Sequence, residues 1–137
     1  MLHVLIHMER HQGRATSEEI AQMLSTHAVV VRRTMAGLRE QGFVDSEKGH
    51  GGGWRLAREL RDITLLDVYR ALGEPVLFAI GPANDHPDCL VEQAVNAALE
   101  DSFREAEALL LARFGKITLA ALARDFDKRF SAAPQPR

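Results

Sequence analysis

The fold is decided by residues 42–57, which read Gly42-Phe43-Val44-Asp45-Ser46-Glu47-Lys48-Gly49-His50-Gly51-Gly52-Gly53-Trp54-Arg55-Leu56-Ala57. Residues 43–48 predict a short β-strand, and residues 54–57 predict a second one. Between them, Gly49, Gly51, Gly52 and Gly53 carry too high an entropic penalty for regular structure and indicate a turn. Two short strands joined by such a turn predict a β-hairpin.

The residues before this hairpin predict two helices in close succession. Thr16, with Glu19 three residues later, forms a capping-box pattern at the start of the first. The second covers residues 28–41, with an N-cap expected from the side chains of residues 25–27 and an end at Gly42, which suits a left-handed position. Two helices across a tight turn form a helix-turn-helix, and a hairpin directly after it is a wing. We therefore predict a mainly α fold with a small β-wing, a winged helix-turn-helix, with a further helix over residues 2–11.

The longest periodic pattern covers residues 90–114. Apolar residues recur at three- and four-residue steps from Val91 to Phe114, and Leu109 widens the stripe, which predicts an amphipathic helix. A helix of some 25 residues is about 37 Å long, more than a domain this small can cover. We therefore expect the stripe to pack on a second subunit. The residues assigned to this dimerisation contact are Val95, Leu99, Phe103, Ala106 and Leu110.

Shorter helices are predicted from Thr64 to Gly73 and from Thr118 onward, each with threonine as the N-cap. These elements divide the chain into a winged helix-turn-helix domain at residues 1–73, a linker at residues 74–89, a dimerisation helix with a closing helix at residues 90–130, and a disordered tail at residues 131–137.

Composition excludes several classes of protein. The 137 residues are 46% hydrophobic and 26% charged, which is ordinary for a globular domain. No apolar run approaches the roughly 18 residues that a membrane span needs, and a single cysteine, Cys89, excludes an internal disulfide. We expect a cytoplasmic protein without a membrane partner. No nucleophile–base arrangement, P-loop or dinucleotide fingerprint is visible, so we do not expect an enzyme.

The charge is distributed unevenly along the chain. The net charge is −2, but residues 1–61 hold nine Lys/Arg against seven Asp/Glu, and residues 27–61 hold seven against four. A locally basic face on an acidic protein is a modest electrostatic footprint for nucleic acid.

Four segments together resemble the Rrf-two family of winged helix-turn-helix transcription regulators, the IscR/NsrR/CymR-like proteins. Residues 42–57 resemble the family's wing, and Ile63-Thr64-Leu65-Leu66-Asp67-Val68 resembles its entry to the next helix. Residues 17–21 resemble its first helix-turn-helix helix, and residues 117–122 resemble its closing helix. The resemblance spans residues 2 to about 126, nearly the whole chain. It implies a homodimer whose recognition helices enter successive major grooves of double-stranded DNA, with wings in flanking minor grooves, on a partly palindromic operator.

The cysteines depart from the family pattern. Cluster-bearing members place three cysteines before the dimer helix, where this chain has only Cys89. We therefore expect no iron–sulfur cluster and no other cofactor, and the chain resembles the cluster-free branch of the family.

The candidate DNA-contacting residues lie on the second helix-turn-helix helix and on the wing. Arginine can bond guanine edges with two hydrogen bonds, although contact with phosphate or water alone is the other interpretation of each arginine. Val29 could meet a thymine methyl group or could pack inward. The full set is His27, Val29, Arg32, Arg33, Arg39, Lys48, His50 and Arg55, with Gly49, Gly51, Gly52 and Gly53 allowing the wing turn to approach phosphate.

Two further groups have competing interpretations. Cys89 precedes a helix, where a thiol could act as a redox sensor, but a small half-buried residue is the interpretation we favour. His3, His7 and His11 are spaced one helical turn apart, which is compatible with a metal ion. No cysteine or acid completes that ligand set, so we expect no metal site.

We expect a sequence-specific DNA-binding transcription regulator, with repression favoured over activation, that responds to redox state or to a small effector near residues 74–88. The alternative is a winged-helix protein-interaction module without DNA binding. The arginine pair at 32–33 and Lys48 favour the first hypothesis, since a pure interaction module need not keep them.

Overall fold

The computed structural model describes residues 1–10, 13–49, 51–79 and 86–132. In chain order its elements are α1 (Leu2–Arg10), α2 (Ser17–Met23), α3 (Ala28–Glu40), β1 (Val44–Glu47), β2 (Gly53–Leu56), the 3-10 turn η1 (Leu60–Asp62), α4 (Leu65–Ala71), α5 (Leu90–Phe114) and α6 (Leu119–Ala132). The mainly helical fold with a two-stranded wing, which the sequence predicts, is confirmed. Within the described residues, no helix combines the length and apolar character needed to cross a membrane.

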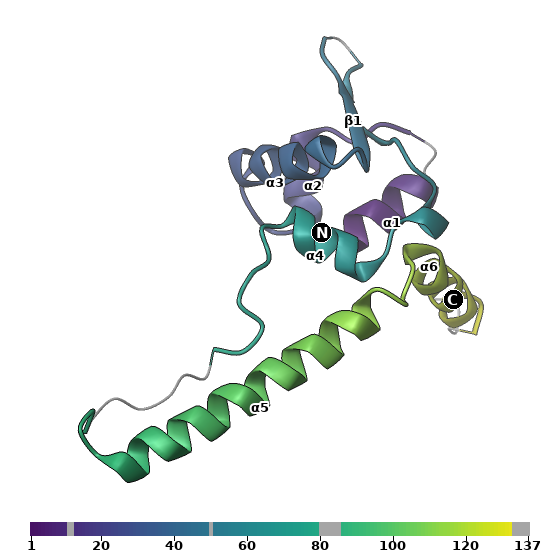
Figure 1. Cartoon of the computed structure of the whole chain (residues 1–137). Helices are drawn as coiled ribbons and strands as arrows, with labels where there is room; N and C mark the ends of the chain where they lie inside the picture. The colour runs from purple at the N-terminus through teal and green to yellow at the C-terminus, as the bar shows by residue number, and fades with distance from the viewer. Residues whose placement is uncertain (11–12, 50, 80–85, 133–137) are drawn as a thin grey trace.

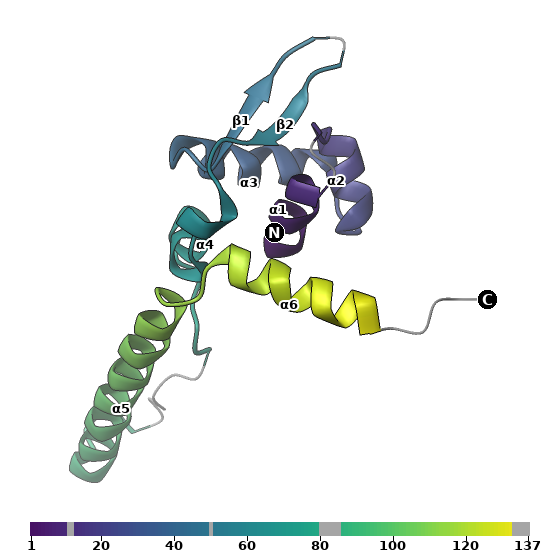
Figure 2. The same ribbon diagram turned by 90° about the vertical axis from the view of Figure 1, so that its right-hand side faces the viewer.

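The elements form a body from which the long helix α5 projects. Figure 1 shows α1 to α4 gathered together, with the hairpin rising from one side and α5 running away from the other. Figure 2 shows α6 lying across the base of the body, beneath α1. The hairpin and α5 therefore lie on opposite sides of the body.

One apolar core holds the body together. Leu5 of α1, Ile20 of α2 and Met35 of α3 are fully buried in this core. Ile63, just before α4, and Leu119, the first residue of α6, are buried in it as well. Each large side chain of this kind stabilises the fold by about 1.5–3 kcal/mol when it leaves water. The core therefore joins the helix-turn-helix to the start of α4 and to the start of α6.

Two helices begin with a capping box, as the sequence predicts for Thr16. The Thr16 hydroxyl accepts a hydrogen bond from the Glu19 N–H, and the Glu19 carboxylate accepts one from the Thr16 N–H at 2.7 Å. Thr64 and Asp67 form the same pair at the start of α4. The N-cap of α3 is His27, which lies within the predicted residues 25–27, but the expected side-chain cap is wrong, because the His27 side chain makes no capping hydrogen bond.

Backbone pairing fixes the base of α5 to the body. Thr64 and Thr118 form an isolated antiparallel bridge, in which the Leu65 N–H donates to the Ile117 carbonyl at 2.9 Å and the Leu119 N–H donates to the Ile63 carbonyl at 2.8 Å. The C-terminal end of α5 is thus tied to the start of α4. The N-terminal end of α5 has no such attachment in the described residues and extends away from the body (Figure 1).

The structure corrects several details. Val30 of α3 is 52% exposed, because Val31, Met35 and Leu38 already fill the buried face of this helix. Helix α6 continues through Ala132, two residues into the predicted disordered tail, and residues 133–137 lie outside the described part of the chain. The C′ position of α3 is as predicted, since Gly42 has a φ of +72°.

Replacing Thr64 with alanine tests the anchor of α4. Loss of the hydroxyl removes one half of the capping box, so Thr64→Ala should lower the free energy of unfolding by about 0.5–2 kcal/mol. Urea unfolding followed by circular dichroism measures the change. Thr34→Ala is the matched control, because Thr34 lies inside α3 and its hydroxyl only donates to the Val30 carbonyl of the same helix. Equal losses for the two variants would contradict a special role for the Thr64 cap.

Candidate nucleic-acid interface

Helix α3 presents one open face to solvent. Its buried face is formed by Val31, Met35 and Leu38, all at most 1% exposed. At about 100° per residue, Val29 and Arg33 lie on the far side of the helix from these three. Val29 is 71% exposed, and the side chain of Arg33 has no ion pair or hydrogen bond within the described residues. This face therefore offers an apolar contact and an uncommitted guanidinium one turn apart.

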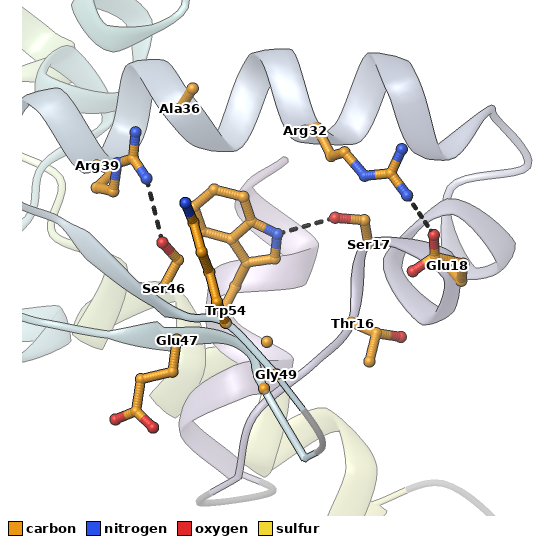
Figure 3. Close-up of a pocket in the computed structure, with 13 residues that line it drawn as sticks. Thr16, Ser17, Glu18, Arg32, Ala36, Arg39, Ser46, Glu47, Gly49 and Trp54 are labelled. Carbon is orange, nitrogen blue, oxygen red and sulfur yellow. Dashed lines mark hydrogen bonds and ion pairs between the residues drawn. The ribbon is translucent and has the colours of Figure 1, made fainter.

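Arg32 and Arg39 lie on the side of α3 that faces α2 and the wing. Arg32 forms an ion pair with Glu18 at the start of α2. Arg39 donates to the Ser46 hydroxyl at 3.2 Å, with its guanidinium carbon 6.0 Å from the Trp54 ring centroid. Figure 3 shows both arginines reaching across from α3, one to α2 and one to the hairpin. Both cations are therefore held in place by neighbouring elements before any ligand arrives.

A cleft of about 530 Å³ separates α3 from the wing. Arg32, Arg39 and Lys48 supply three positive charges to its walls, and Glu18 and Glu47 supply two negative ones. The cleft is thus lined by mixed charge with a small positive excess. An anionic backbone seated here would have to displace or bridge the Arg32–Glu18 pair to use that arginine fully.

Trp54 fastens the wing to the helices. The side chain is 8% exposed, and its indole N–H donates to the Ser17 hydroxyl at 3.0 Å (Figure 3). The backbone of Trp54 also exchanges hydrogen bonds with Ala15, at 3.0 and 2.9 Å. The wing is therefore attached through its backbone to Ala15 before α2, and through the indole to Ser17, the first residue of α2.

The wing turn requires a glycine for steric reasons at one position in particular. A Cβ atom on Gly52 would lie 2.4 Å from the Glu47 carbonyl oxygen, so any side chain there would force the backbone apart. Gly49 and Gly51 have positive φ values of 100° and 78°. His50, a predicted DNA contact, lies outside the described residues.

The charges on the wing fall on two faces. The strand register pairs Asp45 with Arg55 and Ser46 with Trp54, so Arg55 lies on the face opposite to Trp54. Arg55 donates to Asp45 at 3.0 Å, and this hydrogen bond lowers the pKa of the Asp45 carboxyl below its ordinary value. Arg55 is therefore placed away from the cleft, whereas Lys48, which is exposed, lines it.

The long helix α5 has no buried residue, but its apolar side chains differ in their surroundings. Val95 and Leu99 are 52% and 43% exposed, and Ala106 is exposed as well. Phe103 and Leu110 are only half-exposed, and the Phe103 ring lies 5.9 Å from the ring of Phe78 in the chain's own linker. The most open apolar face thus also includes Val91 and Leu109, at 72% and 75% exposed.

The remaining candidates do not converge on a second site. Cys89 is exposed at the N-cap of α5, rather than half-buried as we favoured, and its side chain makes no capping hydrogen bond. The rings of His3 and His7 lie 4.4 Å apart in an edge contact, while His11 lies outside the described residues. Among the residues that the structure describes, no group of three histidine, cysteine or acidic side chains is arranged to hold a metal ion.

Three residues near the cleft were missed by sequence reasoning. Ser17 holds Trp54, Glu18 holds Arg32, and Arg14 forms an ion pair with Glu47 and donates to the Gly51 carbonyl at 3.4 Å. The capping box at Thr16 places residues 17 and 18 at the start of α2. No local pattern indicates a partner for Ser17 that is 37 positions away.

Comparison with known proteins agrees with this geometry. The sequence profile of the Rrf2 family, described as an iron-dependent transcriptional regulator, matches residues 1–125. YwnA of Bacillus subtilis, named as an HTH-type transcriptional regulator, is 35% identical over 69% of this chain and 70% of its own length. YwgB of the same organism, with the same designation, is 33% identical over 67% of this chain, which spans 62% of that protein. The crystal structure of a transcriptional regulator from Lactobacillus plantarum superposes with a TM-score of 0.74 at 24% identity, over 92% of this chain and 86% of the other.

Removing the Ser17 hydroxyl tests how the wing is fastened. Ser17→Ala leaves the buried indole N–H of Trp54 without its acceptor, which should lower the free energy of unfolding by about 1–3 kcal/mol. Because Trp54 is the sole tryptophan of the chain, its fluorescence reports directly on its surroundings and should change as well. Ser102→Ala, on the exposed surface of α5, is the control. A Ser17→Ala protein with unchanged fluorescence and stability would show that the indole bond does not hold the wing.

Proposed function

Because the chain belongs to the Rrf2 family of DNA-binding transcription regulators, we propose that it acts as a homodimer on a partly palindromic operator. The protein is a transcription regulator and not an enzyme. The dimer would pair two α5 helices and direct one recognition helix, α3, and one wing from each subunit toward the DNA. Bound over a promoter in the cytoplasm, such a dimer would repress by excluding polymerase.

The observation that carries this proposal is the uncovered apolar face of α5. Four large apolar side chains on this face, Val91, Val95, Leu99 and Leu109, are each more than 40% exposed. Burying such side chains is worth about 1.5–3 kcal/mol each when it is complete, and a two-fold axis would bury every one of them twice. A second copy of the same face supplies the apolar partner that this helix lacks within its own chain.

In this proposal the open face of α3 and the wing make the contacts with DNA. The α-helix fits the major groove, where Arg33 would bond guanine edges and Val29 would contact a thymine methyl group. Arg32, Arg39 and the exposed His27 would contact phosphates beside the groove. Lys48 would follow the wing into the flanking minor groove. Arg55, on the other face of the wing, would contribute only through phosphate.

The iron dependence in the family's description does not fit this chain. Cysteine thiolates are the usual ligands of iron–sulfur clusters, and Cys89 is the only cysteine in the sequence. No step of the proposed function involves such a cluster.

Arg33→Ala should weaken binding to a duplex selected by the wild-type protein from a random library. Loss of one arginine–guanine contact should reduce affinity by about fivefold to hundredfold and relax selection at one base position in each half-site. Fluorescence anisotropy across a salt series measures the affinity, and repeated selection measures the base preference. Arg129→Ala is the charge-matched control, since Arg129 lies on α6 away from the wing and pairs with Asp125. If both variants bind alike, the DNA contacts lie elsewhere, and if the wild type selects no duplex, the proposal fails.

Leu99→Glu should separate the subunits. A carboxylate in the centre of the apolar α5 contact loses its water on pairing, so the dimer should dissociate and duplex affinity should fall with it. Sedimentation velocity gives the oligomeric state, and thermal melting shows whether the protomer stays folded, as expected for a side chain 43% exposed. Ala97→Glu, which adds the same charge at an exposed position on another side of α5, should remain dimeric. A Leu99→Glu dimer would remove α5 from the interface.

A further inference from the structure

A second cavity, of about 430 Å³, lies where the end of α4, the start of the linker and α5 meet. Tyr69 lines it from α4, Glu74 and Phe78 line it from the linker, and Glu100, Phe103 and Glu107 line it from α5. Its size falls in the range of small-molecule sites, about 300–1,000 Å³. The cavity therefore touches both the DNA-binding body and the long helix.

One wall of the cavity is aromatic. The ring centroids of Phe78 and Phe103 lie 5.9 Å apart, and the planes of the two rings are inclined to each other by 32°. Val76 and Leu77 extend this apolar surface along the linker. A flat apolar group could therefore lie against the Phe78–Phe103 pair.

The charged groups around the cavity are mostly acidic. Glu74, Glu100 and Glu107 face it together with one cation, Arg104, which is already engaged by Glu100 at 3.4 Å and by Asp101 at 3.3 Å. Arg70 lies 3.9 Å from Glu74 on the exposed surface. Glu107 has no ion pair within the described residues. Burial raises the pKa of the Tyr69 hydroxyl, and the negative charges of Glu107 and Glu74 raise it further.

The cavity and the open apolar face lie on different sides of α5. At about 100° per residue, Glu107 lies about 160° around the helix from Val91 and Leu109, and about 80° from Leu99. A second subunit centred on Val91, Val95 and Leu109 would therefore leave the Glu107 side of the cavity accessible. The half-exposed state of Phe103 results from its contact with the chain's own linker.

We propose that this cavity binds a small organic cation with an aromatic or other flat apolar body. The cationic group would lie between the carboxylates of Glu74 and Glu107, and the body would lie on the Phe78–Phe103 pair, where ring faces also attract cations. Only the role of this ligand as an effector rests on the proposed function. The cavity is lined by α4, the linker and α5, so a bound ligand would change the orientation of α5 relative to the DNA-binding body.

Isothermal titration calorimetry of the full chain with benzyltrimethylammonium tests this site. The cation should bind saturably, neutral benzyl alcohol should bind at least about tenfold more weakly, and benzenesulfonate should not bind, because the carboxylates favour positive charge. The Glu74→Gln/Glu107→Gln double variant should weaken the cation by about tenfold and leave benzyl alcohol unchanged. Glu105→Gln, an exposed acid on another side of α5, is the matched control and should bind as the wild type does.

Three results would overturn the proposal. They are the absence of saturable binding of benzyltrimethylammonium, equal affinity for the alcohol and the cation, and an unchanged cation affinity in the double variant. The calorimetry is done without DNA. If the cavity does not bind the cation, the duplex-binding and sedimentation experiments still test the proposed function independently. Conversely, a protein that selected no duplex would still show whether the cavity takes the cation.

Discussion

The short backbone pairing between residues 63–65 and 117–119 sets the geometry of the whole molecule. Two hydrogen bonds of 2.9 and 2.8 Å join the entry to α4 to the exit from α5, and Ile63 and Leu119 bury their side chains in the same core. Because a helix is stiff over 25 residues, fixing one end to the body determines the direction of the rest. The open apolar face is a consequence of this attachment, since a helix held at one end in this direction cannot fold its length back onto its own domain.

The wing depends on a second attachment that is independent of the first. Trp54 pairs with Ala15 through the backbone and with Ser17 through its indole, and Arg14 binds Glu47 on the neighbouring strand. A two-stranded hairpin alone is only marginally stable in water. Residues 14–17, at the entry to α2, therefore supply the additional contacts that hold the wing against the helices. The α3 wall of the cleft is joined to the start of α2 as well, because Arg32 pairs with Glu18.

Features encoded in neighbouring residues could be predicted from the sequence, and features that depend on distant contacts could not. The capping box at Thr16, the glycine end of α3 and the bounds of α5 come from patterns within a few residues. The partners of Arg32 and Trp54 come from α2, 14 and 37 positions away, and no periodicity specifies them. The stripe on α5 was predicted as one surface, but the linker half-covers Phe103 while Val95 stays open, because the path of a linker is set by tertiary packing.

The difference between Arg32 and Arg33 suggests how affinity and selectivity are divided on α3. Arg32 is engaged by Glu18, so a phosphate that binds it must compete with a carboxylate that is already there, and the net gain is small. Arg33 has no such partner among the described residues and, in the proposed complex, would lose only water on contact with DNA. An arginine held in an ion pair keeps one orientation at little gain in affinity, whereas an unpaired one gives its full interaction energy to the base that matches it. Discrimination between sequences should therefore rest mainly on Arg33, with Arg32 fixing the position of the helix in the groove.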